Sequence, residues 1–109
     1  MSKGLLPFTS LNAVAATGAG TFRDLEGVYR EHTLFVVASG VTNSFTIKLE
    51  GSLDNTNWVQ LGTLTPSGTG TVVLAVSVTS HFMRYVRANV TDISGSVTAV
   101  TAMIATGED

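Results

Sequence analysis

The chain has 109 residues, a formal net charge of -2 and no cysteine. This length is typical of one domain, and the lack of cysteine excludes disulfide bonds, thiolate nucleophiles and cysteine-ligated zinc. The basic residues are few and scattered, which argues against a nucleic-acid partner. Hydrophobic residues make up 44% of the chain and charged residues only 13%. This balance predicts a buried core and, in addition, some apolar surface that a partner covers.

Residues 1–10 carry a single lysine and a short apolar patch at residues 5–8. The patch is too short for a signal-peptide core or a membrane span, so we expect a protein made in the cytoplasm with no membrane partner. We predict an N-terminal arm over residues 1–10, either a tether to a neighbouring subunit or a disordered tail, and a single domain over residues 11–109.

The next two segments show no clear periodicity. Residues 11–20 are rich in alanine and glycine, and we predict an edge strand and a turn there because Gly18 and Gly20 would end a helix. Residues 21–31 mix apolar and charged side chains at spacings that fit neither a helix nor a strand. We therefore expect an ordered connection.

From residue 33 onward, short runs rich in valine, threonine, isoleucine and phenylalanine alternate with turn residues, as is typical of a β protein. Residues 33–39 (TLFVVAS) are apolar on both faces and predict a central strand, whereas residues 44–50 (SFTIKLE) alternate and predict a half-exposed strand. The turn formers at residues 54–57 (DNTN) predict a hairpin that joins the second strand to residues 58–64.

Three more strands are predicted at residues 71–79, 82–90 and 95–105. Their alternating apolar side chains are Val72, Leu74, Val76 and Val78, which we expect in the core, then Val86, Ala88 and Val90, and finally Val100, Ala102 and Ile104. The pattern predicts an all-β fold, an antiparallel β-sandwich that is jelly-roll-like, with about seven or eight strands. Because several strands are apolar on both faces, we also expect a homo-oligomer that covers one outer face.

The sequence offers little that could carry chemistry. Asp24, Glu26, Glu31 and His32 lie close together, but their spacing matches no metal-ligand or acid–base motif. We expect a solvated loop whose charges pair locally or face a neighbouring subunit. The chain has no serine-nucleophile elbow, phosphate-binding loop or dinucleotide fingerprint, which predicts that it is not an enzyme and has no cofactor or metal ion.

Two features of the predicted strands could serve binding. Trp58 follows the turn asparagines and is either a sugar-stacking platform or a side chain that packs over the hairpin. Arg84, Tyr85 and Arg87 belong to types that are enriched in protein interfaces, but they are equally compatible with ordinary outward-facing strand positions. Both choices stay open at this point.

Several motifs stand in order along the chain. They are residues 49–58 (LEGSLDNTNW) followed by 61–63 (LGT), upstream residues 16–20 (ATGAG) and 29–33 (YREHT), and downstream residues 84–90 (RYVRANV) leading to Gly95 and a Val-Thr-Ala tail. Together they cover about residues 11–105, and as an ordered set they resemble the small β-sandwich structural proteins of tailed bacteriophages. The resemblance implies a virion component, and the most compatible type is a capsid decoration or cement protein on the capsid surface.

Such a protein would assemble as a trimer on the shell, with itself and the major capsid protein as partners, and the resemblance carries no catalytic residues. The residues that we single out for protein interfaces are Tyr29, Arg30, His32, Trp58, Arg84, Tyr85 and Arg87. Two alternatives stay open. One is a tail- or fibre-associated virion protein, and the other is a carbohydrate-binding module in which Trp58 and Tyr85 contact host glycans.

Overall fold

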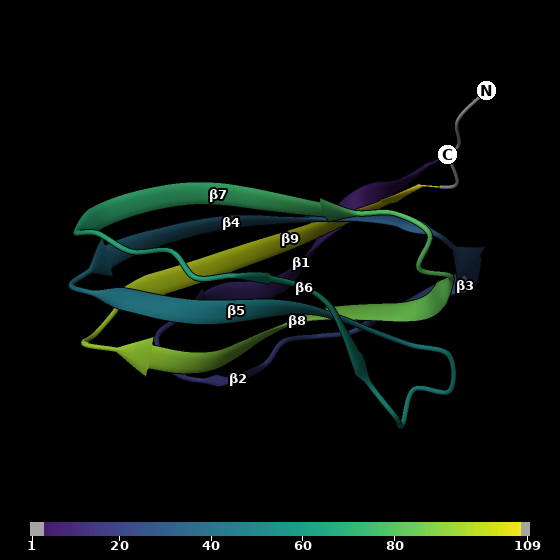
Figure 1. The fold of residues 1–109 in the computed structure, drawn as a ribbon, viewed down its shortest axis with the longest axis horizontal. Helices are drawn as coiled ribbons and strands as arrows, with labels where there is room; N and C mark the ends of the chain where they lie inside the picture. The colour runs from purple at the N-terminus through teal and green to yellow at the C-terminus, as the bar shows by residue number, and fades with distance from the viewer. Residues whose placement is uncertain (1–3, 108–109) are drawn as a thin grey trace.

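The computed structural model describes residues 4–107 of the chain. In this part, nine strands form two antiparallel sheets that face each other (Figure 1), so the predicted β-sandwich is confirmed with nine strands rather than about seven or eight. The upper sheet of Figure 1 contains, in spatial order, β1 (Gly4–Val14), β9 (Ala99–Gly107), β4 (Glu31–Val41) and β7 (Gly70–Val78). The lower sheet contains β2 (Gly18–Ala19), β8 (Met83–Ser94), β5 (Ser44–Ser52) and β6 (Val59–Leu64), with β3 (Arg23–Tyr29) also paired to β8.

The core lies between the two sheets and follows directly from the period of two along each strand. In each of the four central strands, three alternating side chains point inward and are at most 1% exposed. These side chains are Leu34, Val36 and Ala38 of β4, Phe45, Ile47 and Leu49 of β5, Val86, Ala88 and Val90 of β8, and Val100, Ala102 and Ile104 of β9. The alternation seen in the sequence therefore agrees with the core faces of β5, β8 and β9, whereas residues 33–39 of β4 are apolar on both faces and gave no preference.

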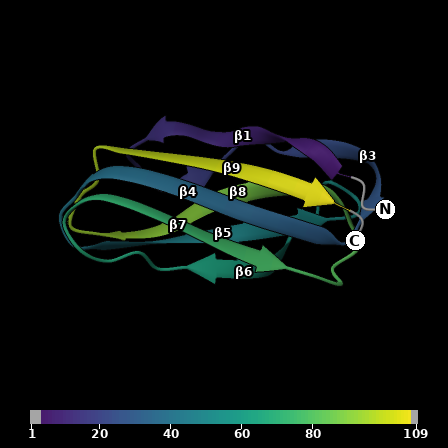
Figure 2. The ribbon, with the colours of Figure 1, turned by 90° about the horizontal axis from the view of Figure 1, so that it is seen from above.

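Strand β7 lies at the margin of the upper sheet, beside β4 (Figure 2). Val72, Val76 and Val78 are partly buried and pack against the core, as predicted. Leu74 lies on the same face but keeps 38% of its surface exposed. An edge position explains the difference, because no strand covers the far side of β7 in the described residues.

The N-terminal residues do not form the arm that the sequence suggested. Residues 4–10 belong to β1, which pairs with β9 from Gly4 opposite Gly107 to Val14 opposite Val100. The pairing contains three register shifts, and such bulges interrupt the alternation on which a strand prediction depends. Residues 1–3 of the predicted arm lie outside the described residues.

One buried serine joins the two sheets. The Ser10 hydroxyl of β1 donates a hydrogen bond to the Thr21 carbonyl (2.8 Å) and accepts one from the Ala88 amide of β8 (2.9 Å). The Thr21 amide donates to the Ser10 carbonyl at 2.8 Å. This junction fixes the segment that crosses from β1 toward β3.

The predicted ordered connection over residues 21–31 is instead mainly strand, since β3 occupies Arg23–Tyr29. Its pairing with β8 is irregular between Asp24 and Tyr29, and Glu26 has φ of +57°. This irregularity breaks the alternation of inward and outward side chains, so the sequence pattern did not indicate a strand here. No helix in the described residues is long and apolar enough to cross a membrane.

Candidate protein-binding surface

Five side chains from three separate segments meet at one end of the lower sheet. The Phe22 ring contacts the Tyr85 ring edge-on at 5.9 Å between centroids and the Trp58 ring at 6.4 Å in a tilted arrangement. The Arg87 guanidinium lies 4.1 Å from the Trp58 centroid, and that of Arg84 lies 5.3 Å from the Tyr85 centroid. We call this cluster the aromatic–arginine surface. It brings together four of the sequence-selected residues, Trp58, Arg84, Tyr85 and Arg87, around a fifth that the sequence did not single out.

The strands place these side chains. On β8, Val86 and Ala88 point into the core, so the neighbouring Tyr85 and Arg87 point to the outer face of the sheet. Trp58 stands immediately before β6, at the end of the turn that follows β5. Phe22 lies just before β3, whose residue Asp24 pairs with Tyr85.

The turn that delivers Trp58 is held by Asp54, as the DNTN sequence predicted. The Asp54 carboxylate accepts hydrogen bonds from the Thr56 amide (2.9 Å) and the Asn57 amide (2.8 Å), and from the Asn57 side-chain amide (2.8 Å). The Ser52 hydroxyl donates to it at 3.0 Å. These donors stabilise the ionised form and hold the pKa of Asp54 well below its usual value. The confirmed β5–β6 hairpin is therefore locked by its own turn.

Each arginine of the surface has a carboxylate that fixes it. Arg87 donates to Glu50 at 2.8 Å, and the Asn89 side-chain amide donates to the other Glu50 oxygen at 3.2 Å. Arg84 donates through two nitrogens to Asp24, at 3.0 and 3.1 Å, and this pairing holds the pKa of Asp24 below its ordinary value. The charges are thus paired and oriented, while 47% of the Arg84 side-chain surface stays exposed.

The other three selected residues do not join this surface. Tyr29 of β3 is half-buried against the core, and Arg30, between β3 and β4, is exposed. His32 is only 1% exposed, so the expected solvated loop is wrong at this residue. His32 lies two residues before Leu34 on β4, so its side chain points to the same inner face of the strand and its ring lies inside the sandwich.

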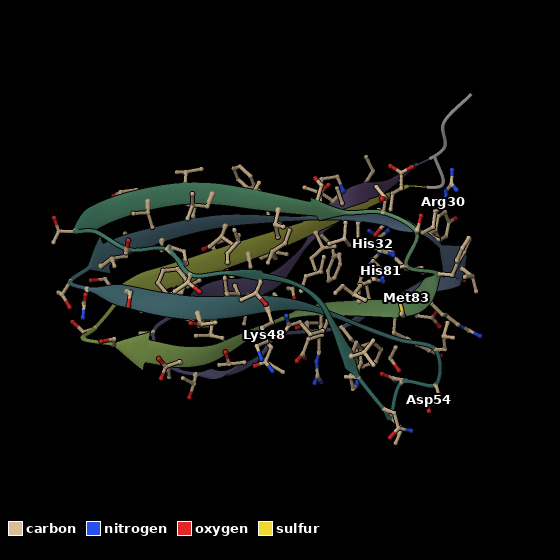
Figure 3. All side chains as sticks on the ribbon, viewed as in Figure 1. Arg30, His32, Lys48, Asp54, His81 and Met83 are labelled. Carbon is tan, nitrogen blue, oxygen red and sulfur yellow. The ribbon has the colours of Figure 1, made fainter. Side chains whose placement is uncertain are left out.

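The His32 ring is fully engaged at the end of the sandwich where Figure 3 also labels Arg30 and His81. Its Nε2 lies 3.0 Å from the Tyr29 carbonyl and 2.9 Å from the His81 carbonyl, so this nitrogen carries the proton. Its Nδ1 accepts from the Thr106 hydroxyl at 3.1 Å. Burial lowers the pKa of His32, and the side chain serves as a structural link between β3, β9 and the β7–β8 loop.

The same end of the molecule carries an open hollow of about 210 Å³ (Figure 3, near Asp54 and Met83). Leu53, Val59 and Met83 give the hollow a mainly apolar lining. The Asp54 carboxylate also lines it but is already hydrogen-bonded within the turn. Among the described residues, no three histidine, cysteine, aspartate or glutamate side chains lie close enough to hold a metal ion. The arrangement offers one exposed and two partly exposed aromatic rings beside oriented charges, which suits the binding of another molecule.

The structure is thus an antiparallel β-sandwich with a candidate contact surface on its lower sheet. No family model matches the chain, and no curated protein matches its sequence significantly. Among solved structures, the SPBc2 prophage-derived protein YomS has a TM-score of 0.65 at 17% identity, with 99% of this chain and 96% of YomS covered.

Two further structures show how widely this fold occurs. The PBSX exported protein XepA has a TM-score of 0.62 at 14% identity, with 100% of this chain but only 37% of XepA covered. The CBM32 of AlyQ, in complex with 4,5-unsaturated mannuronic acid, has a TM-score of 0.58 at 15% identity, with 97% of each chain covered. At these identities the likenesses establish the shared sandwich fold.

Proposed function

We propose that the chain is a non-enzymatic structural protein of a tailed-phage virion that decorates the capsid and binds the major capsid protein through the aromatic–arginine surface. The observation that carries the proposal is the gathering of Phe22, Trp58 and Tyr85 with two oriented arginines at one end of the lower sheet, where Phe22 and Arg84 are exposed and the others are partly buried. Tryptophan, tyrosine and arginine are the residue types that dominate binding hot spots between proteins.

The order already present in the surface favours tight binding. Asp24 and Glu50 hold the two arginines in place before a partner arrives, so less side-chain entropy is lost on association. Truncation of a hot-spot residue weakens binding by about 2 kcal/mol or more, which corresponds to roughly 30-fold in Kd. Many copies on one shell would add such modest contacts through multivalency.

Two lines of similarity support a virion origin. The ordered sequence motifs resemble those of phage structural sandwiches, and a similar fold occurs in the SPBc2 prophage-derived protein YomS and in the PBSX exported protein XepA. Binding that is selective for the assembled shell would stabilise that state by mass action. A decoration role needs a small domain with side chains already oriented for contact, and the small sandwich with its paired arginines is consistent with that role.

The binding test uses shells of the parent phage prepared without this chain, to which purified protein is added back. Tyr85→Ala should bind with a Kd about 30-fold weaker than the wild-type protein, or weaker still. Thr91→Ala is the control, because Thr91 lies on the same strand and is exposed, but is outside the aromatic–arginine surface. Equal binding by the two variants would refute the assignment of the surface, and no binding by the wild-type protein would refute the capsid role.

Glycan binding is the second candidate, favoured by the clustered, partly exposed aromatic rings and by the likeness to the CBM32 of AlyQ, which was solved with an unsaturated uronic acid. One face of the Trp58 ring is already covered by Arg87 at 4.1 Å, and a stacked sugar would need an open ring face. Titration with uronic-acid oligosaccharides tests this candidate. Binding that is lost in Trp58→Ala with the fold intact would support it, and no binding by the wild-type protein would remove it.

A further inference from the structure

Strand β7 is a long sheet edge without the features that normally prevent edge pairing. Its nine residues (GTVVLAVSV) contain no charge and no proline. Its register against β4 runs without interruption from Val72 opposite Ala38 to Val78 opposite His32. An uncharged, apolar edge with a regular register presents unpaired backbone N–H and C=O groups to any chain that can add a strand.

The other edges of the sandwich are protected. Strand β1 contains Pro7 and three register shifts. Strand β3 carries Arg23, Asp24 and Glu26 and one register shift, and β2 has two residues. Strand β6 has six residues and a register shift against β5. Bulges, charges, proline and short length are the devices that block edge pairing, and among the described edges β7 alone has none of them over Val72–Val78.

Two side chains near the middle of β7 also lack full cover, whereas Val72, Val76 and Val78 are partly buried. Leu74 faces the core side but is 38% exposed, and Val73 on the outer side is 54% exposed. The outer positions of β7 continue across β4 and β9 as a surface without charge, which we call the uncharged face. It consists of Val73, Ala75 and Ser77 of β7, Thr33, Phe35 and Val37 of β4, and Thr101, Met103 and Ala105 of β9. A strand added beside β7 would cover Leu74 and extend both faces of the upper sheet.

We propose that the β7 strands of two copies of this chain pair antiparallel about a two-fold axis at Ala75, joining their upper sheets into one continuous sheet. This register is self-complementary. Leu74 of one copy lies opposite Val76 of the other, and Val72 lies opposite Val78, so core-side apolar residues meet each other. On the outer side, Ala75 lies opposite its own counterpart and Val73 lies opposite Ser77, with no charge on either strand.

A second copy fits this edge better than an unrelated polar partner. It supplies a strand of the same length, the same alternation and the same lack of charge, and a two-fold contact buries identical surfaces on both copies. The pairing is independent of the proposed shell binding, because the aromatic–arginine surface lies on the lower sheet. It also replaces the expected trimer with a two-fold assembly, since an edge paired with itself is complete with two copies.

Charge substitutions at the two-fold axis test the proposal by analytical ultracentrifugation over micromolar to hundreds of micromolar protein. The wild-type protein should be a dimer. Ala75→Lys and Ala75→Glu each place like charges opposite one another, so each should weaken the dimer by up to about fivefold. Ala75 is an exposed outward position, so the unfolding midpoint of both variants should stay near the wild-type value.

Mixing the two variants is the decisive arm, because lysine then faces glutamate and a heterodimer should form. Ala105→Lys is the control, since it adds the same charge to the uncharged face on β9, away from the edge. Failure of the mixture to dimerise would overturn the register. If Ala105→Lys weakened the dimer as much as Ala75→Lys, the two copies would pack through their uncharged faces and the edge pairing would be wrong. A wild-type monomer or trimer would also overturn the proposal.

Discussion

Ser10→Ala should destabilise the sandwich far more than the loss of one small hydroxyl suggests. Ser10 is 4% exposed and bridges the two sheets through Thr21 and Ala88. The bond to the Thr21 carbonyl contributes about 1 kcal/mol, and leaving the buried Ala88 amide without its acceptor costs about 1–3 kcal/mol. We therefore expect the free energy of unfolding to fall by about 2–4 kcal/mol.

The assay is urea unfolding followed by circular dichroism and tryptophan fluorescence, with the change read from the midpoint at constant m-value. Ser94→Ala is the control, because Ser94 is exposed and its hydroxyl accepts one bond from Asn43 at 2.9 Å. Its free energy of unfolding should change by no more than about 0.5 kcal/mol. If Ser10→Ala lay within that same range, the account of the junction between the sheets would be refuted.

Three further outcomes are expected from the same assay. Phe45→Ala, at 1% exposure, should cost about 3–5 kcal/mol through the cavity it leaves, and a loss below about 1 kcal/mol would contradict the described core. Gly40→Ala should lower the free energy of unfolding by at least about 1 kcal/mol, because Gly40 has φ of +63° and an added Cβ would meet the Thr98 side chain. Gly27→Ala is its control and should be nearly neutral, because a Cβ there makes only an ordinary contact with Tyr29. Burial lowers the pKa of His32 below 6.5, so under mildly acidic conditions the unfolded state binds a proton that the folded state does not. The free energy of unfolding should therefore fall as the pH drops below 6.5, and His32→Gln should make this pH dependence weaker.

The core strands could be predicted from sequence because their alternation is regular. Residues 44–50 have one clean apolar face, and the DNTN turn after them is satisfied by its own side chains, so local information was sufficient. Strands β1 and β3 were missed or misplaced for the opposite reason. Their bulges and the positive φ at Glu26 break the period of two, and only pairing with distant strands reveals them.

The candidate surface was predicted in part. Trp58, Tyr85 and Arg87 stood out by residue type, but Phe22 joins them only through the path of the chain before β3, which the sequence did not indicate. Glu50 is the register partner of Arg87 on β5, and this information requires the strand order. His32 was misjudged although a signal existed, since it shares the inward phase of Leu34, Val36 and Ala38 on β4.

The central claim is that the chain acts by binding other virion proteins on the capsid surface. Quantitative mass spectrometry of purified virions, referenced to the major capsid protein, tests it most directly. A copy number comparable with that of the shell protein is the expected result. A few copies per particle would contradict capsid decoration and place the protein in the tail, and complete absence from the virion would contradict the structural role altogether.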